Sequence, residues 1–144
     1  ILFNHESPLR PERFVTQKVV CAACRIAAGS PERLHLGNID IQRDWGWAPE
    51  YVEAMWRMLQ QGKPRDYVIA TGETRSLKDF VAAAFAAVGL HWTDHVETDP
   101  GLMRPTDIRI SHADPSLALA HLGWQAQTHM EDVVRRMVDG AALV

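Results

Sequence analysis

Three short polar clusters contain side chains that could bind an anionic or sugar-containing ligand. The first is residues 4–8 (N-H-E-S-P) with Arg10, the second is residues 36–38 (L-G-N) followed by 43–47 (R-D-W-G-W), and the third is residues 104–107 (R-P-T-D). Arginine guanidinium groups pair bidentately with phosphate oxygens, and a nearby carboxylate can accept hydrogen bonds from sugar hydroxyls. The same spacing also suits ordinary loops and surface ion pairs, so the pattern indicates candidate sites without fixing a ligand.

Other groups of reactive residues have simpler structural interpretations. Cys21 and Cys24 form a C-x-x-C within an apolar stretch, but no second ligand pair of a zinc site follows, and we expect small buried residues of a helix. His91 and His95 have the i, i+4 spacing of metal ligands, but their segment is not clearly helical and no third ligand joins them. A nucleophilic triad is equally unsupported, since no G-x-S-x-G motif is present. The sequence therefore predicts no metal site and no hydrolase site.

The composition limits the classes of function. The chain has 144 residues, of which 47% are hydrophobic and 23% charged, as in a single soluble globular domain. The formal net charge of −3 does not favour a nucleic acid or an anionic membrane surface as a partner. No run approaches the roughly 18 apolar residues of a membrane span. Because the chain opens on Ile1 within an apolar run, we expect a fragment whose first strand is already under way.

Helical and strand-like periods alternate along the chain. The expected helices cover residues 13–28, 49–61, 76–88, 115–122 and 128–139. The expected strands cover residues 1–3, 33–36, 66–70 and 108–110. Ser76 with Asp79, and Thr128 with Glu131, have the spacing of capping boxes at two of the helix starts. This alternation predicts one α/β domain.

These elements place the polar residues where ligands commonly bind. The cluster at residues 4–8 follows the first strand directly, and ligands of open α/β sheets bind beyond the carboxyl ends of strands. Lys18 lies on its helix away from Val19 and Ile26, so it is either exposed to solvent or turned towards a bound anion. The element pattern leaves these alternatives open.

Taken together, the motifs resemble the GDP-mannose 4,6-dehydratases of the extended short-chain dehydrogenase/reductase superfamily. The matching runs, in the family's order, are residues 2–8, 14–16 with Lys18, 36–38, 43–46, 51–56, 68–73, 104–106 and 122–124. They span nearly the whole chain, and N-H-E-S-P, R-D-W-G and I-A-T-G-E are specific to this family among its relatives. The resemblance implies an α/β fold. In this reading residues 1–144 are the C-terminal nucleotide-sugar-binding lobe of a Rossmann-fold, NAD(P)-binding enzyme.

The resemblance also implies the residues of a GDP-mannose site. By position, its substrate-binding residues are Asn4, Val15, Lys18, Leu36, Asn38, Arg43, Arg104 and Asp107. Arg43 and Arg104 correspond to the family's pyrophosphate arginines, and Asp107 to a carboxylate that grips the ribose hydroxyls. His5 and Arg10 correspond to positions that meet the NADP cofactor.

The remaining members of this set have roles implied in the same way. Asn4 corresponds to a contact with the sugar diphosphate, and Lys18 to a residue beside the nucleotide. Val15 and Leu36 correspond to apolar contacts with the guanine, with Asn38 in the same turn.

The sequence also departs from the family pattern. Asp107 stands where the family usually has Glu, Leu9 replaces a common Arg, and Trp47 replaces a common His. The shorter carboxylate is expected to weaken or shift the ribose contact, and Leu9 to remove a charge near the cofactor phosphate. The loop at residues 91–102 matches poorly and receives no role.

The family reaction is an internal redox dehydration by a cytoplasmic lyase that forms homo-oligomers, dimers or tetramers. It converts GDP-mannose to GDP-4-keto-6-deoxymannose and water, and it needs a glycine-rich NADP loop and a Tyr-x-x-x-Lys pair. Neither Tyr51 nor Tyr67 has a Lys four residues later. We therefore expect no catalytic residue in this chain, a catalytic half upstream, and a fragment that is inactive and poorly stable alone. The alternatives are another GDP-sugar reductase or epimerase, or a GDP-binding module without turnover.

Overall fold

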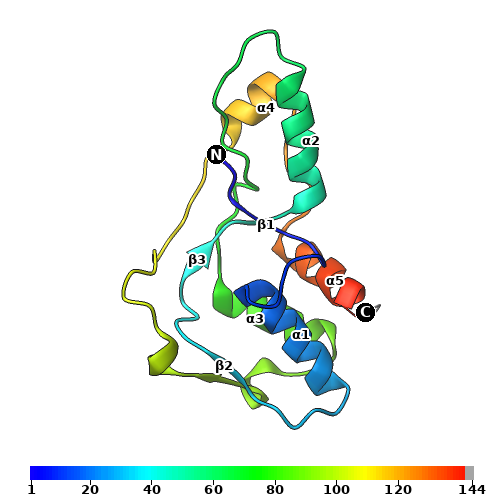
Figure 1. The fold of residues 1–144 in the computed structure, drawn as a ribbon, viewed down its shortest axis with the longest axis vertical. Coiled ribbons are helices and arrows are strands. Elements are labelled where there is room, and N and C mark those ends of the chain that lie inside the picture. The colour runs from blue at the N-terminus through cyan, green and yellow to red at the C-terminus, as the bar shows by residue number, and fades with distance from the viewer. Residues whose placement is uncertain (142–144) are drawn as a thin grey trace.

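The structure is a computed structural model that describes residues 1–141, and its five α-helices form two groups (Figure 1). Helices α2 and α4 lie together at one end, and α1, α3 and α5 pack together at the other. The helices are α1 (Val15–Ala27), α2 (Ala48–Leu59), α3 (Leu77–Ala87), α4 (Ser116–Leu122) and α5 (Met130–Ala141). Two short 3-10 helices, η1 (Trp92–Asp94) and η2 (Pro100–Leu102), lie between α3 and α4. The five helices expected from the sequence are thus confirmed, with small shifts at their ends.

The strands are short and form three separate pairs. Strand β1 (Asn4–Glu6) runs parallel to β4 (Trp45–Trp47), and β2 (Leu34–Leu36) runs parallel to β6 (Val96–Thr98). Strand β3 (Gln42–Arg43) runs antiparallel to β5 (Arg75–Ser76). Strands and helices are mixed along the chain, which confirms the α/β class.

Several strand predictions need correction. The first strand begins at Asn4, and residues 1–3 make one parallel bridge, between Leu2 and Ile69, so the expected strands 1–3 and 66–70 are both reduced to that bridge. The expected strand 108–110 likewise makes a single bridge, from Ile110 to Gln42. Strands β3 to β6 were not predicted, because two or three residues are too short to show a period of two. Pairing between distant segments decides these elements.

Two apolar cores hold the two ends of the molecule. The larger core joins α1, α3 and α5 with β2, β4 and β6. The smaller one contains Tyr51 and Ala54 of α2, Ala118 and Leu122 of α4, and Trp124 with Tyr67, Ile69 and Ala126. The cavity described below lies against the larger core, so packing fixes the elements that line it.

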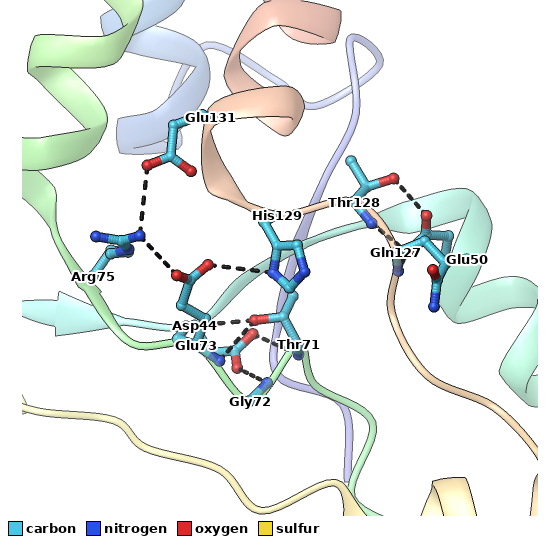
Figure 2. A network of polar contacts seen from close by, with 10 residues as sticks. All are labelled: Asp44, Glu50, Thr71, Gly72, Glu73, Arg75, Gln127, Thr128, His129 and Glu131. Carbon is cyan, nitrogen blue, oxygen red and sulfur yellow. Dashed lines mark hydrogen bonds and ion pairs between the residues drawn. The ribbon is translucent and has the colours of Figure 1, made fainter.

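One of the two expected capping boxes is present. The Ser76 hydroxyl accepts a hydrogen bond from the Asp79 backbone N–H at 3.1 Å, and the Asp79 carboxylate accepts one from Ser76 N–H at 3.1 Å. The second prediction is wrong, because α5 begins at Met130, two residues after Thr128, and the Thr128 N–H that Glu131 would accept in a capping box donates to the Glu50 carboxylate at 3.3 Å. The Thr128 hydroxyl donates to the same carboxylate (Figure 2). A carboxylate of α2 thus takes the place of the one expected within the helix.

The remaining structural expectations concern cysteines, metals and membranes. Cys21 and Cys24 are free and lie in α1, but both are half-buried, and burial raises the pKa of each thiol. Within residues 1–141, no group of three or more His, Cys, Asp or Glu side chains could hold a metal ion. In the same range, the helices are too short or too polar to cross a membrane.

Candidate functional site

A cavity of about 230 Å³ lies where α1, the end of β2, η2 and the loop after η2 meet. It is lined by Val15, Lys18, His35, Leu36, Gly37, Asn38, Ile41, Leu77, Leu102, Arg104 and Asp107. Six of the predicted substrate-binding residues are in this set, and they come from three distant chain segments, at 15–18, 36–38 and 104–107. Tertiary folding therefore brings together most of the residues that the sequence singled out.

Helix α1 and strand β2 position the first four of these residues. Val15 begins α1 and Lys18 lies one turn further on, half-buried, with its Nζ donating a 2.9 Å hydrogen bond to the His35 carbonyl. Leu36, the last residue of β2, is buried at 3% exposure. The lysine is thus turned towards β2 and lines the cavity.

A tight backbone approach closes the cavity near the end of β2. A Cβ atom on Gly37 would lie 2.5 Å from the carbonyl oxygen of Leu102, so only glycine fits between the two backbones. The Asp99 N–H donates to the Leu36 carbonyl at 2.7 Å and fixes the start of η2 beside this turn. The Asn38 carboxamide oxygen accepts from Asp40 N–H at 2.9 Å, which leaves its NH₂ group for a ligand.

The lining divides into an apolar and a polar part. The apolar part consists of Val15, Leu36, Ile41, Leu77 and Leu102. The polar part has the cationic side chains of Lys18 and Arg104, the Asp107 carboxylate and the Asn38 amide. Such a surface can cover a flat ring on one side and meet an anionic group and hydroxyls on the other.

The sequence reading missed several lining residues. Ile41 lies in the stretch without a clear period, Leu77 was interpreted as core, and Leu102 ends the loop that received no role. His35 was seen as a strand residue, yet it faces this cavity and lies 3.6 Å from Glu97. An available signal was Gly37 within L-G-N, since a glycine between two candidate contacts is typical of close backbone approach.

Two predicted substrate-binding residues do not line the described cavity. Arg43, in β3, donates from Nη1 to the carbonyls of Gln42 at 2.8 Å and Ile108 at 2.7 Å. Asn4 begins β1 and pairs with Trp45 of β4. Their positions are therefore set by strand pairing.

The two residues predicted to meet the cofactor lie at and just after β1. The His5 ring stacks on Tyr51 with centroids 4.9 Å apart, and its Nδ1 lies 2.8 Å from the Phe3 carbonyl. Arg10 pairs with the buried Glu6 carboxylate at 3.0 Å and donates to the His5 carbonyl at 3.3 Å. Burial raises the pKa of Glu6, while the Thr16 hydroxyl and Arg10 oppose that rise. Arg10 therefore supports the backbone that presents His5.

A buried aspartate ties the R-D-W-G motif to the A-T-G-E motif (Figure 2). Asp44 is fully buried, and its two carboxylate oxygens accept from Thr71 N–H at 2.9 Å and Gly72 N–H at 2.8 Å. Burial raises the pKa of Asp44, and these backbone hydrogen bonds act against the rise. Two of the three motifs that carry the family resemblance are thus joined by one buried carboxylate next to β3.

A chain of ion pairs continues from this clamp to α5. The Glu73 carboxylate lies 2.7 Å from Arg75 and 3.2 Å from the His129 ring, and Arg75 lies 3.7 Å from Glu131 (Figure 2). These side chains are half-buried or exposed, so the contacts contribute little stability individually. They connect β5 to the start of α5, away from the lining of the cavity.

The histidines with metal-like spacing have other contacts. The His91 ring lies 2.6 Å from the Thr93 hydroxyl, and His95 stacks on Phe85 with centroids 5.8 Å apart. Neither ring meets a second histidine in these contacts. Both belong to the packing around η1.

Comparisons with known proteins place the chain in a family. A family model described as GDP-mannose 4,6 dehydratase matches residues 1–137. GDP-mannose 4,6 dehydratase 1 of Arabidopsis thaliana is 52% identical over 139 residues, covering 96% of this chain and 38% of that protein. GDP-mannose 4,6 dehydratase 2 of the same plant is 49% identical, again over 96% of this chain and over 37% of its own length. The chain thus spans well under half the length of these relatives.

Solved structures share the fold. The structure of RMD from Pseudomonas aeruginosa complexed with NADPH superposes with a TM-score of 0.88 at 20% identity, covering 99% of this chain and 48% of that one. At this identity the likeness concerns the fold alone. The family model and the curated relatives supply the finer assignment: the chain belongs to the GDP-mannose 4,6 dehydratase family.

Proposed function

We propose that this chain is the nucleotide-sugar-binding part of a GDP-mannose 4,6-dehydratase and that its cavity holds the guanosine diphosphate portion of GDP-mannose. The observation that carries the proposal is the convergence of Val15, Lys18, Leu36, Asn38, Arg104 and Asp107 on one cavity. The residues were selected from sequence motifs that are far apart in the chain. Residues so far apart in the sequence are not expected to line one cavity by chance.

The chemistry of the lining supports a nucleoside diphosphate. The apolar side chains can cover a purine, the Asn38 amide can donate to the base, and Arg104 and Lys18 supply positive charge for phosphate oxygens. Asp107 can accept hydrogen bonds from ribose hydroxyls. The volume of about 230 Å³ is below the roughly 300–1,000 Å³ of typical ligand pockets, so this chain would hold only part of a nucleotide sugar.

In this proposal the whole enzyme binds NADP, and the bound cofactor would supply hydride transfer to and from the sugar. His5 fits a position beside such a cofactor, because its ring is half-exposed and held by Tyr51 and the Phe3 carbonyl. Arg10 fits less well as a direct phosphate ligand, since Glu6 already neutralises it, and it would act by holding His5. The proposed product is GDP-4-keto-6-deoxymannose with release of water, and the acid–base residues would lie outside this chain.

The same proposal describes a cytoplasmic lyase that works as a homo-oligomer. The free thiols of Cys21 and Cys24 support a reducing compartment, where disulfides rarely persist. The family membership supports the class of reaction. Gel filtration with light scattering on the whole enzyme tests the oligomeric state, and a monomer would contradict that part of the proposal.

A binding experiment tests the nucleotide site. We expect the substitution Arg104→Ala to weaken GDP binding by about 1.5–3 kcal/mol, the free energy of a charged hydrogen bond. Isothermal titration calorimetry on the whole enzyme measures this change. Arg109→Ala removes the same charge from the same loop outside the lining and is the matched control, with near-native affinity expected. Equal affinities for wild type and Arg104→Ala would contradict the assignment.

Product analysis tests the reaction. The whole enzyme is incubated with GDP-mannose and NADP, and the resulting nucleotide sugar is identified by mass spectrometry and NMR. We expect a product lighter than the substrate by one water, with a keto group at C4 and a methyl group at C6. A product that has not lost water, such as an epimer or a reduced sugar, would favour a different GDP-sugar enzyme. GDP binding without turnover would favour a binding module.

A further inference from the structure

The segment 99–111 crosses one side of the cavity and is attached at both of its ends. At the first end, Asp99 N–H donates to the Leu36 carbonyl at 2.7 Å, and the Leu102 carbonyl packs against Gly37. Arg104 and Asp107, which face the cavity, follow this attachment. The first end therefore depends on β2 and on a glycine that admits the close approach.

At the second end, the backbone of β3 holds the segment. Gln42 N–H donates to the Arg109 carbonyl at 2.8 Å, and Ser111 N–H donates to the Gln42 carbonyl at 3.0 Å. Both bonds lie beyond Asp107 in the sequence. The backbone ladder thus begins only after the residues that face the cavity.

Apolar packing contributes little to the stretch between these attachments. Residues 101–106 are all exposed, and Ile108 is 65% exposed. The turn within it is closed by Asp107 N–H, which donates to the Arg104 carbonyl at 3.2 Å. A loop with so few buried contacts opens easily unless a side chain from elsewhere holds it.

Arg43 supplies such a contact. Its Nη1 donates to the Ile108 carbonyl at 2.7 Å and to the Gln42 carbonyl at 2.8 Å, which joins β3 to the residue directly after Asp107. A guanidinium is planar and always charged, so its hydrogen bonds to carbonyl groups are strong and directional. This attachment is the one nearest in sequence to the cavity-facing Asp107.

We propose that Arg43 is a positioning residue that holds the loop carrying Arg104 and Asp107 over the cavity before any ligand binds. The loop is then preorganised, and binding does not have to supply its ordering. The consequence for nucleotide affinity rests on the function proposed above, whereas the effect on the loop itself does not. A direct contact of Arg43 with phosphate would add to this role without replacing it.

Hydrogen exchange of the ligand-free protein tests the proposal. Amide exchange is followed by mass spectrometry in peptides that cover residues 103–111, for wild type, Arg43→Ala and Arg43→Gln. We expect the protected amides of Asp107 and Ser111 to exchange faster in both variants, by on the order of tenfold, the equivalent of one charged hydrogen bond. Arg109→Ala is the charge-matched control, because its backbone carbonyl still accepts from Gln42, and it should exchange as wild type does.

An internal reference separates a local effect from unfolding. Amides of α3, whose Phe80, Val81, Ala84 and Phe85 are fully buried, should keep their protection in every variant. Unchanged exchange at residues 103–111 in Arg43→Ala and Arg43→Gln would overturn the proposal. An equal acceleration in Arg109→Ala would overturn it too, because charge and not the Ile108 contact would then be responsible.

A GDP titration of the same proteins distinguishes this idea from the proposed function. Faster loop exchange in Arg43→Ala with weaker GDP binding supports both. If wild type binds no GDP while the loop still exchanges faster in the variants, the proposed function fails and the positioning role stands. If GDP binding weakens and loop exchange is unchanged, Arg43 acts by direct contact and the positioning role fails.

Discussion

Asp107 lines the cavity, at a position where the family resemblance leads us to expect a longer Glu side chain. It shares its loop with Arg104, and its backbone N–H closes the turn between them. A carboxylate at this place can accept hydrogen bonds from the ribose hydroxyls of a bound nucleotide. The contribution of Asp107 to nucleotide affinity can therefore be tested by changing the ribose hydroxyls of the ligand as well as by changing the protein.

We predict that Asp107→Ala weakens GDP binding by about 1–3 kcal/mol and abolishes the preference for GDP over 2′,3′-dideoxy-GDP. Asp107→Glu introduces the longer carboxylate expected from the family resemblance and should bind GDP at least as tightly as wild type. Calorimetric titrations with the two nucleotides check both statements. If wild type binds the dideoxy nucleotide and GDP with equal affinity, the ribose does not contact Asp107.

Glu6 is a buried carboxyl group whose charge depends on its surroundings. It is 1% exposed, accepts from the Thr16 hydroxyl at 2.7 Å and pairs with Arg10. Desolvation is the largest influence and raises its pKa above the ordinary value. The folded protein thus binds this proton more tightly than the unfolded chain.

The free energy of unfolding depends on pH because the folded and unfolded states bind the Glu6 proton with different affinities. Because the pKa of Glu6 is raised on folding, its contribution to the free energy of unfolding falls as pH rises through the range just above the ordinary value of 4.5. We predict that Glu6→Gln removes this fall, seen as a flatter dependence of the urea midpoint between about pH 4 and pH 7. Glu32→Gln is the contrast, since pairing with Arg25 lowers the pKa of Glu32 and its contribution is lost as pH falls.

At the scale of elements, the contact between the end of β2 and η2 shapes the cavity. The Gly37 position leaves no room for a Cβ atom beside the Leu102 carbonyl, and that carbonyl belongs to backbone that cannot rotate away like a side chain. Displacing η2 would move the attached loop with Arg104 and Asp107. The geometry of the site therefore depends on one residue that contributes no side chain.

We predict that Gly37→Ala lowers GDP affinity by at least tenfold, about 1.4 kcal/mol, because η2 must shift away from β2. Gly62→Ala is the matched control, since a Cβ atom there meets nothing within 4 Å. The two variants are compared by GDP titration and by thermal unfolding. Native affinity in Gly37→Ala would show that the loop tolerates the shift.

At the scale of the whole molecule, two apolar cores are joined by strand pairing and by a few polar contacts. The pair β1–β4 leads from one core to the other, and Asp44 holds the turn at Thr71 and Gly72. The Glu50 carboxylate of α2 accepts from Gln127 N–H at 3.0 Å and Thr128 N–H at 3.3 Å, just before α5. These contacts set how the α2–α4 end sits relative to the cavity.

Trp124 of the smaller core and the exposed Trp56 of α2 give a matched test of this division. Trp124 is 2% exposed and donates to the Glu50 carbonyl at 3.0 Å, whereas Trp56 on α2 is 61% exposed. We predict that Trp124→Ala destabilises the chain by about 3–5 kcal/mol, while Trp56→Ala changes stability by about 0.5 kcal/mol or less. Urea unfolding followed by circular dichroism measures both. Similar losses for the two variants would contradict the assignment of Trp124 to the core.

Much of the fold and of the candidate site could be predicted from sequence where the signal is local. The helices α1, α2 and α3 have apolar residues at helical spacing over ten or more residues, and the Ser76–Asp79 cap needs only neighbours in the chain. The second cap was wrong because the Thr128 N–H donates to a carboxylate 78 residues away in the sequence. The strand predicted at residues 33–36 is confirmed as β2, whereas β3 to β6 were missed because each exists only through a partner that the local pattern does not reveal.

The site divides in the same way. Residue type indicated which side chains could meet an anion or hydroxyl groups, because these chemical abilities belong to the residue. The expected contacts with a guanine and a ribose came only from the family resemblance. Only the tertiary structure decided that Lys18 bonds to the His35 carbonyl, that Leu77 and Leu102 complete the apolar wall, and that Arg43 reaches Ile108. Those contacts join residues that are far apart in the chain, and their distances are set by how α1, β2, β3 and η2 pack on a common core.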